Sequence, residues 1–501
     1  MGSPRPSGTP AGAAGAAPKP TPASTNPPAN PPVPSVPSVP SVPSTGRSIE
    51  LVLLAFAAVL TTSALVLVEA NQEQELTRTL LYLGLAYLGL FTVAHLVVRK
   101  LAPYADPLIL PCAAVLNGLG LVMIHRVDLA RSDRAAQLGS PQPDLFAGRQ
   151  VAWTAIALML FIGTLWFVKD HRTLARYGYT MGFAGLVLIV LPGILPSSIS
   201  EVNGAKIWLR LSIFSIQPGE FAKVLLMIFF SALLISKRDL FTTAGRKVLG
   251  MEFPRPRDLA PLLLAWGASV GVLALENDLG TSLLYFGVML VLLYTATERV
   301  SWLIIGMVFF IAGAIAAYHL FAHVRARVQI WLDPLADYNH SGFQLSQALF
   351  GLGTGGVGGT GLGAGRPELV PFAWSDFIVA SIGEELGLIG LAAVLVIYLV
   401  LVTRGLRSAL AVRDSFGKLL ATGLSFSLAL QVFVVIGGVT KLIPLTGLTI
   451  PFMSAGGSSL VANYIIVALL LRISNAARSP ASKPAPPKTP LADARTEMVE
   501  R

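Results

Sequence analysis

The sequence predicts an all-α polytopic membrane protein with about twelve transmembrane helices. Of its 501 residues, 53% are hydrophobic and only 13% are charged, whereas soluble domains carry about 25% charged residues. Mean hydropathy is +0.67. Apolar runs long enough to cross about 30 Å of hydrocarbon recur along the chain. This composition excludes a secreted or cytosolic enzyme, because there is too little polar side chain to cover soluble domains.

The chain is predicted to begin and end in tails. Residues 1–48 form a Pro-rich tail, with 14 prolines in the first 44 residues, a composition that cannot bury a core. No basic segment with a cleavage site precedes the first apolar run, which is therefore expected to be a retained span. Residues 474–501 form a second tail, rich in Pro and charge. Between the tails we separate N-terminal transmembrane helices at 49–200 from a membrane core at 201–473.

Twelve runs qualify as spans. They lie at residues 49–69, 78–98, 107–125, 149–168, 176–195, 217–236, 260–275, 279–297, 301–320, 376–403, 416–439 and 448–473. The run at 260–275 is the shortest, and without it the two tails would lie on opposite sides of the membrane.

The distribution of basic residues predicts the orientation. With the N-terminus inside, Lys and Arg are about threefold denser in the inner loops than in the outer ones, as the positive-inside rule requires. Both tails are therefore expected to be cytoplasmic. The net charge of +10 is attributed to these loops, and no nucleic-acid partner is expected.

The long loop at 321–375 is predicted to face outward. Its aromatic residues argue against simple disorder. Nine glycines fall between Gly351 and Gly365, and Gly353, Gly355 and Gly358 match G-x-G-x-x-G. A nucleotide site is excluded because no strand precedes the motif and no P-loop Lys follows. We expect the glycines to let the backbone lie close to the membrane or a substrate.

Asp376 is the principal catalytic candidate, since this loop re-enters the membrane there. A carboxylate at that depth could act as a general base for a hydroxyl. The alternative is an N-cap, because Ser375 or Asp376 before an apolar run is also typical of a helix start.

Other charges near membrane depth are functional or paired by default. Glu220 and Lys223 are three residues apart on one helix face and form either an internal ion pair or a substrate contact. Glu384 and Glu385 point in adjacent directions, so at most one is expected to face a given cavity. Asp278 is expected to be a turn residue.

The outer loop also carries arginines. Arg325, Arg327 and Arg366 suit phosphate oxygens, which makes a lipid-linked diphosphate a plausible ligand; headgroup anchoring is the alternative. The six histidines show no metal-ligand spacing, and the single cysteine, Cys112, cannot contribute to a cysteine metal cluster. We expect no metal held by protein ligands and no cofactor motif.

Several segments together resemble the SEDS family (shape, elongation, division and sporulation), which includes RodA and FtsW. The resemblance covers roughly residues 200–475. Its motifs are, in chain order, Asn203 to Trp208, Gln217 to Glu220 with Lys223, Asp278 to Thr281, Arg325 to Pro334, Gly342 to Gln347, Gly358 to Gly363, Ser375 to Ile378, Gly383 to Gly387, Pro444 to Gly447, Pro451 and Ser454 to Ser459.

This resemblance implies a peptidoglycan glycosyltransferase that polymerises lipid II outside the bacterial cytoplasmic membrane, beside a class B penicillin-binding protein. It places Asp376 at the family's proposed catalytic aspartate, which outweighs the N-cap interpretation. A divalent cation, Mg²⁺ or Mn²⁺, could accompany the substrate diphosphate. The candidate substrate-binding residues are Arg325, Arg327, Glu220, Lys223, Trp208, Glu368, Glu384, Ser458 and Ser459.

The sequence departs from the family pattern at Trp374, where His is common, and at Gly219, Ile207 and Ala455. Two spans before the family core of ten, with the Pro-rich tail, resemble an actinobacterial member. The segments around Glu298, Asn463 and Arg472 are more similar to the elongation type, RodA, than to the division type, FtsW. A division-type protein, a lipid II flippase and a non-catalytic scaffold remain the alternatives.

Overall fold

The computed structural model describes residues 45–72, 78–202, 204–210, 215–237, 246–248, 251–253, 267, 271 and 278–480. Within these ranges, ten helices are long and apolar enough to cross a membrane, and the shorter apolar helix α6 joins them. The chain is therefore a helical, multi-pass membrane protein, as predicted. The predicted span at 260–275 lies outside the described residues except for Gly267 and Gly271.

Helices follow the predicted apolar runs that the structure describes, and four further helices lie between them, two of these inside the loop predicted at 321–375. The helices are α1 (Arg47–Asn71), α2 (Arg78–Leu101), α3 (Ile109–Gln137), α4 (Ala147–Phe167), α5 (Thr173–Arg176), α6 (Gly178–Ile194), α7 (Ser197–Ser200), α8 (Pro218–Ser236), α11 (Leu279–Thr297), α12 (Ser301–Leu320), α13 (Ala322–Leu332), α14 (Phe343–Gly355), α15 (Ile378–Ala411), α16 (Ser415–Val439) and α17 (Gly457–Arg478), with a 3₁₀ turn, η1, at Pro367–Leu369.

The last helix starts later than hydropathy predicts. Residues 448–456 are not helical, and α17 begins only at Gly457. The segment is apolar, but Phe452 has a positive φ of 67°. Its carbonyls accept side-chain hydrogen bonds from neighbouring helices, Thr449 from Gln431 and Pro451 from Tyr398. Tertiary hydrogen bonds thus replace the helical ones that hydropathy alone predicts.

Three short antiparallel pairs depart from the all-α expectation. Strands β1 (Glu201–Val202) and β2 (Ala205–Lys206) pair, as do β3 (Leu209–Arg210) and β4 (Ser215–Ile216), and β5 (Arg246–Val248) and β6 (Met251–Phe253). Gly204, with φ of +79°, allows the tight turn between β1 and β2. Strands this short leave no apolar run for a sequence pattern to detect.

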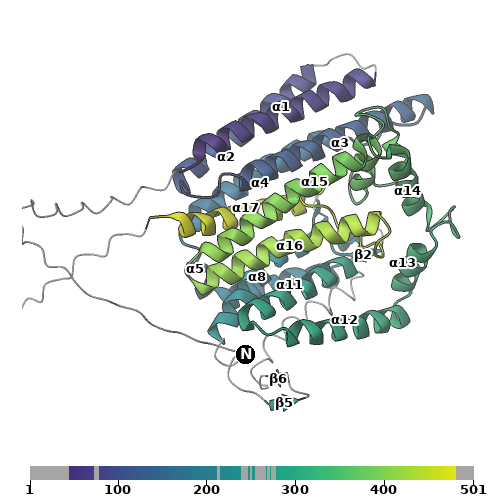
Figure 1. The fold of residues 1–501 in the computed structure, drawn as a ribbon. Helices are drawn as coiled ribbons and strands as arrows, with labels where there is room; N and C mark the ends of the chain where they lie inside the picture. The colour runs from purple at the N-terminus through teal and green to yellow at the C-terminus, as the bar shows by residue number, and fades with distance from the viewer. Residues whose placement is uncertain are drawn as a thin grey trace, which may run out of the picture. The chain divides into compact units, whose positions relative to one another are not determined.

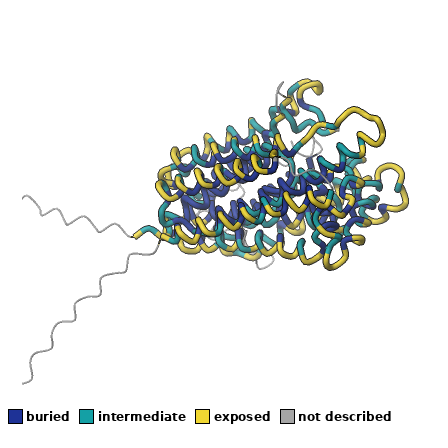
Figure 2. Tube along the Cα trace, turned by 90° about the horizontal axis from the view of Figure 1, so that it is seen from above, coloured by how far each residue is buried: buried dark blue, intermediate teal, exposed yellow. Residues whose placement is uncertain are grey.

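Burial divides the helices into inner and outer ones. Helices α3 and α17 are mostly buried, whereas α12 is almost entirely exposed. In Figure 1, α1 and α2 lie at one edge of the helices and α12 at the opposite edge, and Figure 2 shows buried residues along the inward sides. Exposed apolar side chains cover α1, α2 and α12, which suits surfaces that face lipid.

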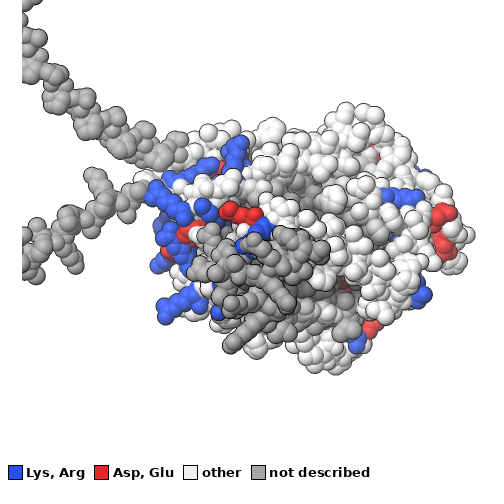
Figure 3. All heavy atoms as spheres, turned by 60° about the horizontal axis from the view of Figure 1, so that its bottom comes forward, with Lys and Arg blue, Asp and Glu red and all other residues white. Residues whose placement is uncertain are grey.

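The helices have one strongly basic end, which we call the basic end. Figure 3 shows Lys and Arg gathered there. Ion pairs tie the chain together at this end: Asp106 with Arg478 and, at 3.7 Å, with Arg404, and His171 with Asp414 at 2.9 Å. Because α15 has Arg404 near its C-terminus, the Asp376 loop before α15 lies at the other end, with α13, α14 and η1.

Candidate functional site

Asp376 lies two residues before α15, in the turn that ends the long loop. The N-cap position of α15 is Phe377, and no side chain caps this helix. The N-cap interpretation of Asp376 is therefore wrong. Instead its Oδ1 accepts a hydrogen bond from the Ser375 hydroxyl at 2.9 Å, and the side chain stays partly exposed.

Residues 444–456, between α16 and α17, hold this turn. The Ser454 hydroxyl donates to the Ser375 carbonyl at 2.8 Å and accepts from the Ile450 N–H at 3.0 Å. The Ala455 N–H donates to the Trp374 carbonyl at 2.8 Å. The two residues before Asp376 are thus fixed by backbone hydrogen bonds to a distant segment.

Arg327 of α13 lies near Asp376. Its Nη1 donates to the Thr446 carbonyl at 3.1 Å. A Cβ atom placed on Gly447 would lie 3.7 Å from Arg327 Nη2 and 3.9 Å from Asp376 Oδ2. The guanidinium and the carboxylate therefore approach one point, above a glycine whose φ is +74° and which leaves that point open. Arg325, by contrast, is exposed.

The surroundings of Asp376 favour proton uptake near neutral pH. Burial raises the pKa of Asp376 to about 6, while the Ser375 hydrogen bond and the Arg327 charge oppose that rise. A carboxylate with a pKa near 6 is ionised at pH 7 and still accepts a proton better than an ordinary aspartate. This geometry suits a general base.

Three further charged residues, Asp278, Glu220 and Lys223, belong to α8 or to the start of α11. Asp278, predicted to be a turn residue, is the N-cap of α11 and accepts from the Thr281 N–H at 3.0 Å. The charges of both Arg327 and Glu220 act on Asp278. Glu220 in turn pairs with Lys223 at 2.9 Å, which is the internal ion pair that the sequence offered as one of two interpretations.

Lys223 also joins this group to the loop before α17. Its Nζ donates to Gln431 Oε1 at 3.0 Å, and Gln431 Nε2 donates to the Thr449 carbonyl at 2.8 Å. We call Asp376, Arg327, Asp278, Glu220 and Lys223 the Asp376 cluster: an ion pair joins Glu220 to Lys223, and the others act on one another through their charges.

Glu384 and Glu385 contact the glycine-rich segment and not the Asp376 cluster. Glu384 Oε1 accepts from the Arg366 N–H at 2.7 Å, and Glu385 Oε2 accepts from the Gly363 N–H at 2.9 Å. The loop wraps around the start of α15 and reaches both glutamates, while the expectation that at most one faces a given cavity stays a prediction. Arg126 from α3 completes the contact, donating to Glu385 Oε1 at 2.8 Å and to the Gly365 carbonyl at 2.7 Å.

The glycines serve close backbone packing, here against α15. A Cβ on Gly355 would lie 2.0 Å from the Gly383 carbonyl oxygen, and one on Gly359 would lie 2.3 Å from that of Glu385. Gly387 interrupts α15 with φ of 67°, and the Leu388 N–H donates to the Gly356 carbonyl at 2.9 Å. The close approach was predicted, but its partner is this kink in α15.

The remaining candidates have hydrogen bonds and ion pairs with residues other than Asp376. The Trp208 backbone N–H donates to the Ser200 carbonyl at 3.2 Å. Ser458 Oγ accepts from the Gln217 N–H at 2.9 Å, and Ser459 Oγ accepts from Asn463 at 3.3 Å. Glu368 lies 3.6 Å from Arg366, whose side chain is largely exposed. These contacts give each residue an internal partner; their role toward a substrate stays a prediction.

Trp374 packs beside the cluster on aromatic and cationic neighbours. It stacks on Phe146 with ring centroids 4.9 Å apart, and the Arg131 guanidinium lies 4.4 Å from its ring centroid. The ends of α3 and α4 thereby hold the turn before Asp376. This packing accounts for a tryptophan at the position where the family commonly has histidine.

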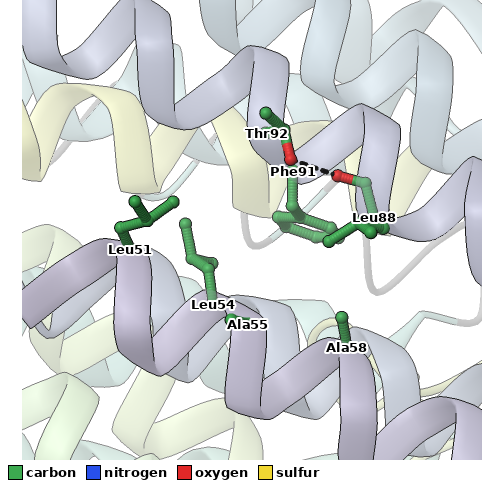
Figure 4. A pocket seen from close by; sticks show the side chains of 7 residues that line it. All are labelled: Leu51, Leu54, Ala55, Ala58, Leu88, Phe91 and Thr92. Atoms are coloured by element: carbon green, nitrogen blue, oxygen red, sulfur yellow. Dashed lines mark hydrogen bonds between the residues drawn. The ribbon is translucent and has the colours of Figure 1, made fainter.

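Neither the best-defined pocket nor any cluster of metal-binding residue types provides a candidate site in the described part of the chain. A small apolar pocket between α1 and α2 is lined by hydrocarbon except for Thr92, whose hydroxyl donates to the Leu88 carbonyl at 2.7 Å (Figure 4). It offers no group that could bind a polar ligand. Among the described residues, no three His, Cys, Asp or Glu side chains gather where they could hold a metal ion.

Fold and site together define a multi-pass helical membrane protein with a carboxylate, flanked by an arginine, at the end of the helices opposite the basic end. The model of the FtsW/RodA/SpoVE family of cell cycle proteins matches residues 106–479. The chain belongs to this family, the SEDS family that its motifs resemble.

Similar proteins extend the match. The chain is 56% identical over 457 residues to "Peptidoglycan glycosyltransferase RodA" of Mycobacterium tuberculosis, covering 91% of this chain and 96% of that protein. It is 33% identical over 393 residues to "Probable peptidoglycan glycosyltransferase FtsW" of Geobacter sp. (strain M18), covering 77% of this chain and all of that one. A solved chain from "Structural coordination of polymerization and crosslinking by a peptidoglycan synthase complex" has a TM-score of 0.56 at 25% identity, covering 74% of this chain and 97% of that chain.

Sequence reasoning missed two polar residues that organise the site. Gln431 joins Lys223 to the loop before α17, and Arg126 joins α3 to α15. Both are polar side chains within or next to predicted spans, which is the signal that would have found them.

Proposed function

We propose that this chain is an elongation-type peptidoglycan glycosyltransferase, which polymerises lipid II into glycan strands at the outer face of the bacterial cytoplasmic membrane and so supports cell shape. The near full-length similarity to a mycobacterial RodA, at 56% identity, supports the elongation role over the division role. The observation that carries the chemistry is Asp376, partly exposed and beside Arg327, with a pKa of about 6.

In the proposed reaction, a sugar hydroxyl of one lipid-linked unit attacks the anomeric carbon of another and inverts its configuration. Asp376 takes the proton from the attacking hydroxyl. The bond from the anomeric carbon to the diphosphate oxygen breaks, and polyprenyl diphosphate leaves with the electron pair. General-base help of this kind is worth about 10² to 10⁴ in rate.

The leaving diphosphate needs positive charge more than a proton. Arg327 is placed to supply it, since its guanidinium, a group with five N–H donors, lies near Asp376 and is held there by the Thr446 carbonyl. Arg325 is exposed on the same helix, and Lys223 lies deeper in the Asp376 cluster. Trp208, Glu368, Glu384, Ser458 and Ser459 remain proposed substrate contacts.

The cation of the proposal, Mg²⁺ or Mn²⁺, is one that accompanies the substrate diphosphate. No step of the proposed reaction depends on it.

The proposed topology has twelve spans, a core of ten preceded by α1 and α2, with both termini cytoplasmic. The gathering of Lys and Arg at the end where α1 begins supports this orientation (Figure 3). The Tyr285 hydroxyl near the start of α11 donates to the Gly219 carbonyl at the start of α8 at 2.8 Å. Both helices therefore start at the same end, as the proposed topology requires.

A transpeptidase partner of the class B penicillin-binding type completes the proposal. The solved relative from a peptidoglycan synthase complex supports such an assembly. Two lipid-linked substrates would enter from the outer leaflet.

The test is polymerisation of lipid II by the purified chain, alone and with its transpeptidase, for wild type and Asp376→Asn. Polymer from wild type and none from the variant is the expected result. Wild-type product formation by Asp376→Asn would remove Asp376 from the role of base.

The same assay separates the rival functions. Lipid II movement across vesicles without polymer would favour a flippase, whose pathway could use the buried charges of Glu220 and Lys223. If the assay shows neither polymer nor lipid II movement, the non-catalytic scaffold is the function that remains.

A further inference from the structure

Helix α1 precedes the part of the chain that the family model matches, which begins at residue 106. It nevertheless contacts the outer loop of the core. Residues 360–366, which we call the glycine segment, lead to Asp376 within the same loop and lie against the end of α1. A role for α1 in catalysis rests on the proposed function.

Hydrogen bonds join the last residue of α1 and the residue after it to the glycine segment. Asn71 Nδ2 donates to the Leu362 carbonyl, and Gln72 Nε2 donates to the Gly363 carbonyl, across 291 residues of sequence. Leu362 also packs on a small apolar cluster that includes Leu65 and Val68 of α1.

The backbone itself touches α1 at Gly363. Its φ is +83°, and a Cβ there would lie 2.9 Å from Asn71 Cβ and 3.0 Å from the Val68 carbonyl oxygen. A Cβ atom essentially never lies as close as the first of these contacts, and the second is tighter than most that real Cβ atoms make. A glycine is therefore required at 363 for the segment to seat on α1.

The opposite side of the glycine segment is bound to α15. The Thr360 and Gly361 N–H groups donate to the Glu384 and Glu385 carbonyls at 3.0 and 2.9 Å. Arg126 binds the Gly365 carbonyl and Glu385 together. The segment is thus held between α1 on one side and α15 on the other.

The other end of α1 is anchored at the basic end. Arg47 donates to the Ala105 carbonyl and pairs with Glu50, and Glu50 Oε1 lies 2.7 Å from His95 Nδ1 of α2. The side chains of Arg47, Glu50 and His95 are all buried. With 25 residues, α1 is a rod of about 37 Å fixed at both ends.

We infer that α1 positions the catalytic loop, with Asn71 and Gln72 as positioning residues that press the glycine segment onto α15 and so set the place of Asp376. Neither side chain is expected to touch the substrate. Their effect reaches the reaction through residues 363–376.

The first experiment measures lipid II polymerisation by Asn71→Ala/Gln72→Ala in the full chain with its transpeptidase. Loss of two side-chain hydrogen bonds should lower kcat about tenfold with KM little changed, at an unchanged thermal midpoint. The isosteric Asn71→Asp/Gln72→Glu pair, which replaces donors by acceptors facing carbonyls, should lower kcat further. A kcat equal to wild type in both variants would overturn the inference.

Glycine substitutions supply a matched comparison. Gly361 and Gly363 both have positive φ, +103° and +83°, but a Cβ on Gly361 meets only Ala364 at 3.8 Å. Gly361→Ala therefore introduces backbone strain but no steric clash with α1. Gly363→Ala should lower kcat about tenfold more than Gly361→Ala; equal losses would show that α1 contact is irrelevant.

Hydrogen exchange tests the inference without any activity. In Asn71→Ala/Gln72→Ala, amides of residues 359–366 should exchange about tenfold faster than in wild type, while those of α16 stay unchanged. Unchanged exchange in the glycine segment would refute positioning by α1. If the wild type is inactive but the variant still exchanges faster, the proposed function is refuted while the contact between α1 and the glycine segment stays supported.

Discussion

At Asp376 the sequence supplies the carboxylate and the tertiary structure supplies its proton affinity. The aspartate, Ser375 and the helix start at Ile378 are adjacent in the chain, so their proximity needs no fold. Arg327, Thr446 and Gly447 come from distant segments. Only their convergence creates a partly exposed carboxylate beside a cation.

The rate of polymerisation should depend on the ionisation of Asp376. A pKa of about 6 means that the base is half protonated at that pH and about nine-tenths ionised at pH 7. The rate should therefore rise with pH through about 6 and level off above 7. A rate that stays constant from pH 5 to 7, with lipid II saturating, would contradict the assignment.

Asp376→Asn should also change stability in a direction that the raised pKa sets. The folded chain binds the Asp376 proton more tightly than the unfolded chain does, so stability is lost as the pH rises from about 4, where the aspartate ionises in the unfolded chain, to about 6, where it ionises in the folded chain. The neutral amide avoids that cost. The thermal midpoint of the variant at pH 8 should exceed that of wild type, and this excess should shrink as the pH falls from about 6 to about 4, where the aspartate becomes neutral in the unfolded chain as well.

Arg327→Gln should weaken catalysis in two ways. The Arg327 charge lowers the Asp376 pKa, so its removal should move the midpoint of the pH profile upward from about 6. It should also reduce kcat/KM about tenfold or more by removing charge near the diphosphate. Exposed Arg325→Gln on the same helix is the control and should leave the midpoint in place; a lower midpoint in Arg327→Gln would oppose the proposed contact.

At the scale of elements, α15 shows how the fold departs from hydropathy. The helix is interrupted at Gly387, and the glycine-rich loop fills the interruption with backbone hydrogen bonds from Leu388 and Ile389 to Gly356 and Val357. The sequence motifs contain the glycines and the two glutamates, but they do not indicate that the glycine-rich loop packs on the glutamates of α15. Arg126, from a helix some 240 residues earlier, holds the arrangement.

Arg126→Met should destabilise the protein strongly. It leaves Glu385 buried without its cation, a change that typically costs about 3 to 5 kcal/mol. Thermal unfolding in detergent should show a clearly lower midpoint. Adding Glu385→Gln, which keeps an acceptor for the Gly363 N–H, should recover most of the loss; a double variant no better than the single one would argue against a direct pair.

At the scale of the whole molecule, the two ends of the helices differ in charge and in chemistry. The basic end carries ion pairs such as Asp106–Arg478 and His171–Asp414, whereas the Asp376 cluster lies at the other end. Such an asymmetry is what the positive-inside rule gives to a chain with both tails in the cytoplasm. In the proposed topology it puts the chemistry outside the cell.

Cysteine labelling tests this orientation. In a Cys112→Ser background, His340→Cys in the exposed outer loop should react with a membrane-impermeant maleimide on intact cells. Arg413→Cys, exposed between α15 and α16, should react only after the membrane is opened. Labelling of Arg413→Cys on intact cells would reverse the topology.

The sequence by itself determined the class of protein, most helix positions and the catalytic candidate. Apolar composition and run length are local properties, and they suffice to put a helix in lipid. The tertiary structure alone decided that Arg327 rather than Arg325 approaches Asp376, that α17 begins nine residues after the predicted start at 448, and that α1 holds a loop 291 residues away. These depend on hydrogen bonds and close backbone contacts between distant segments, which leave no periodic trace in the sequence.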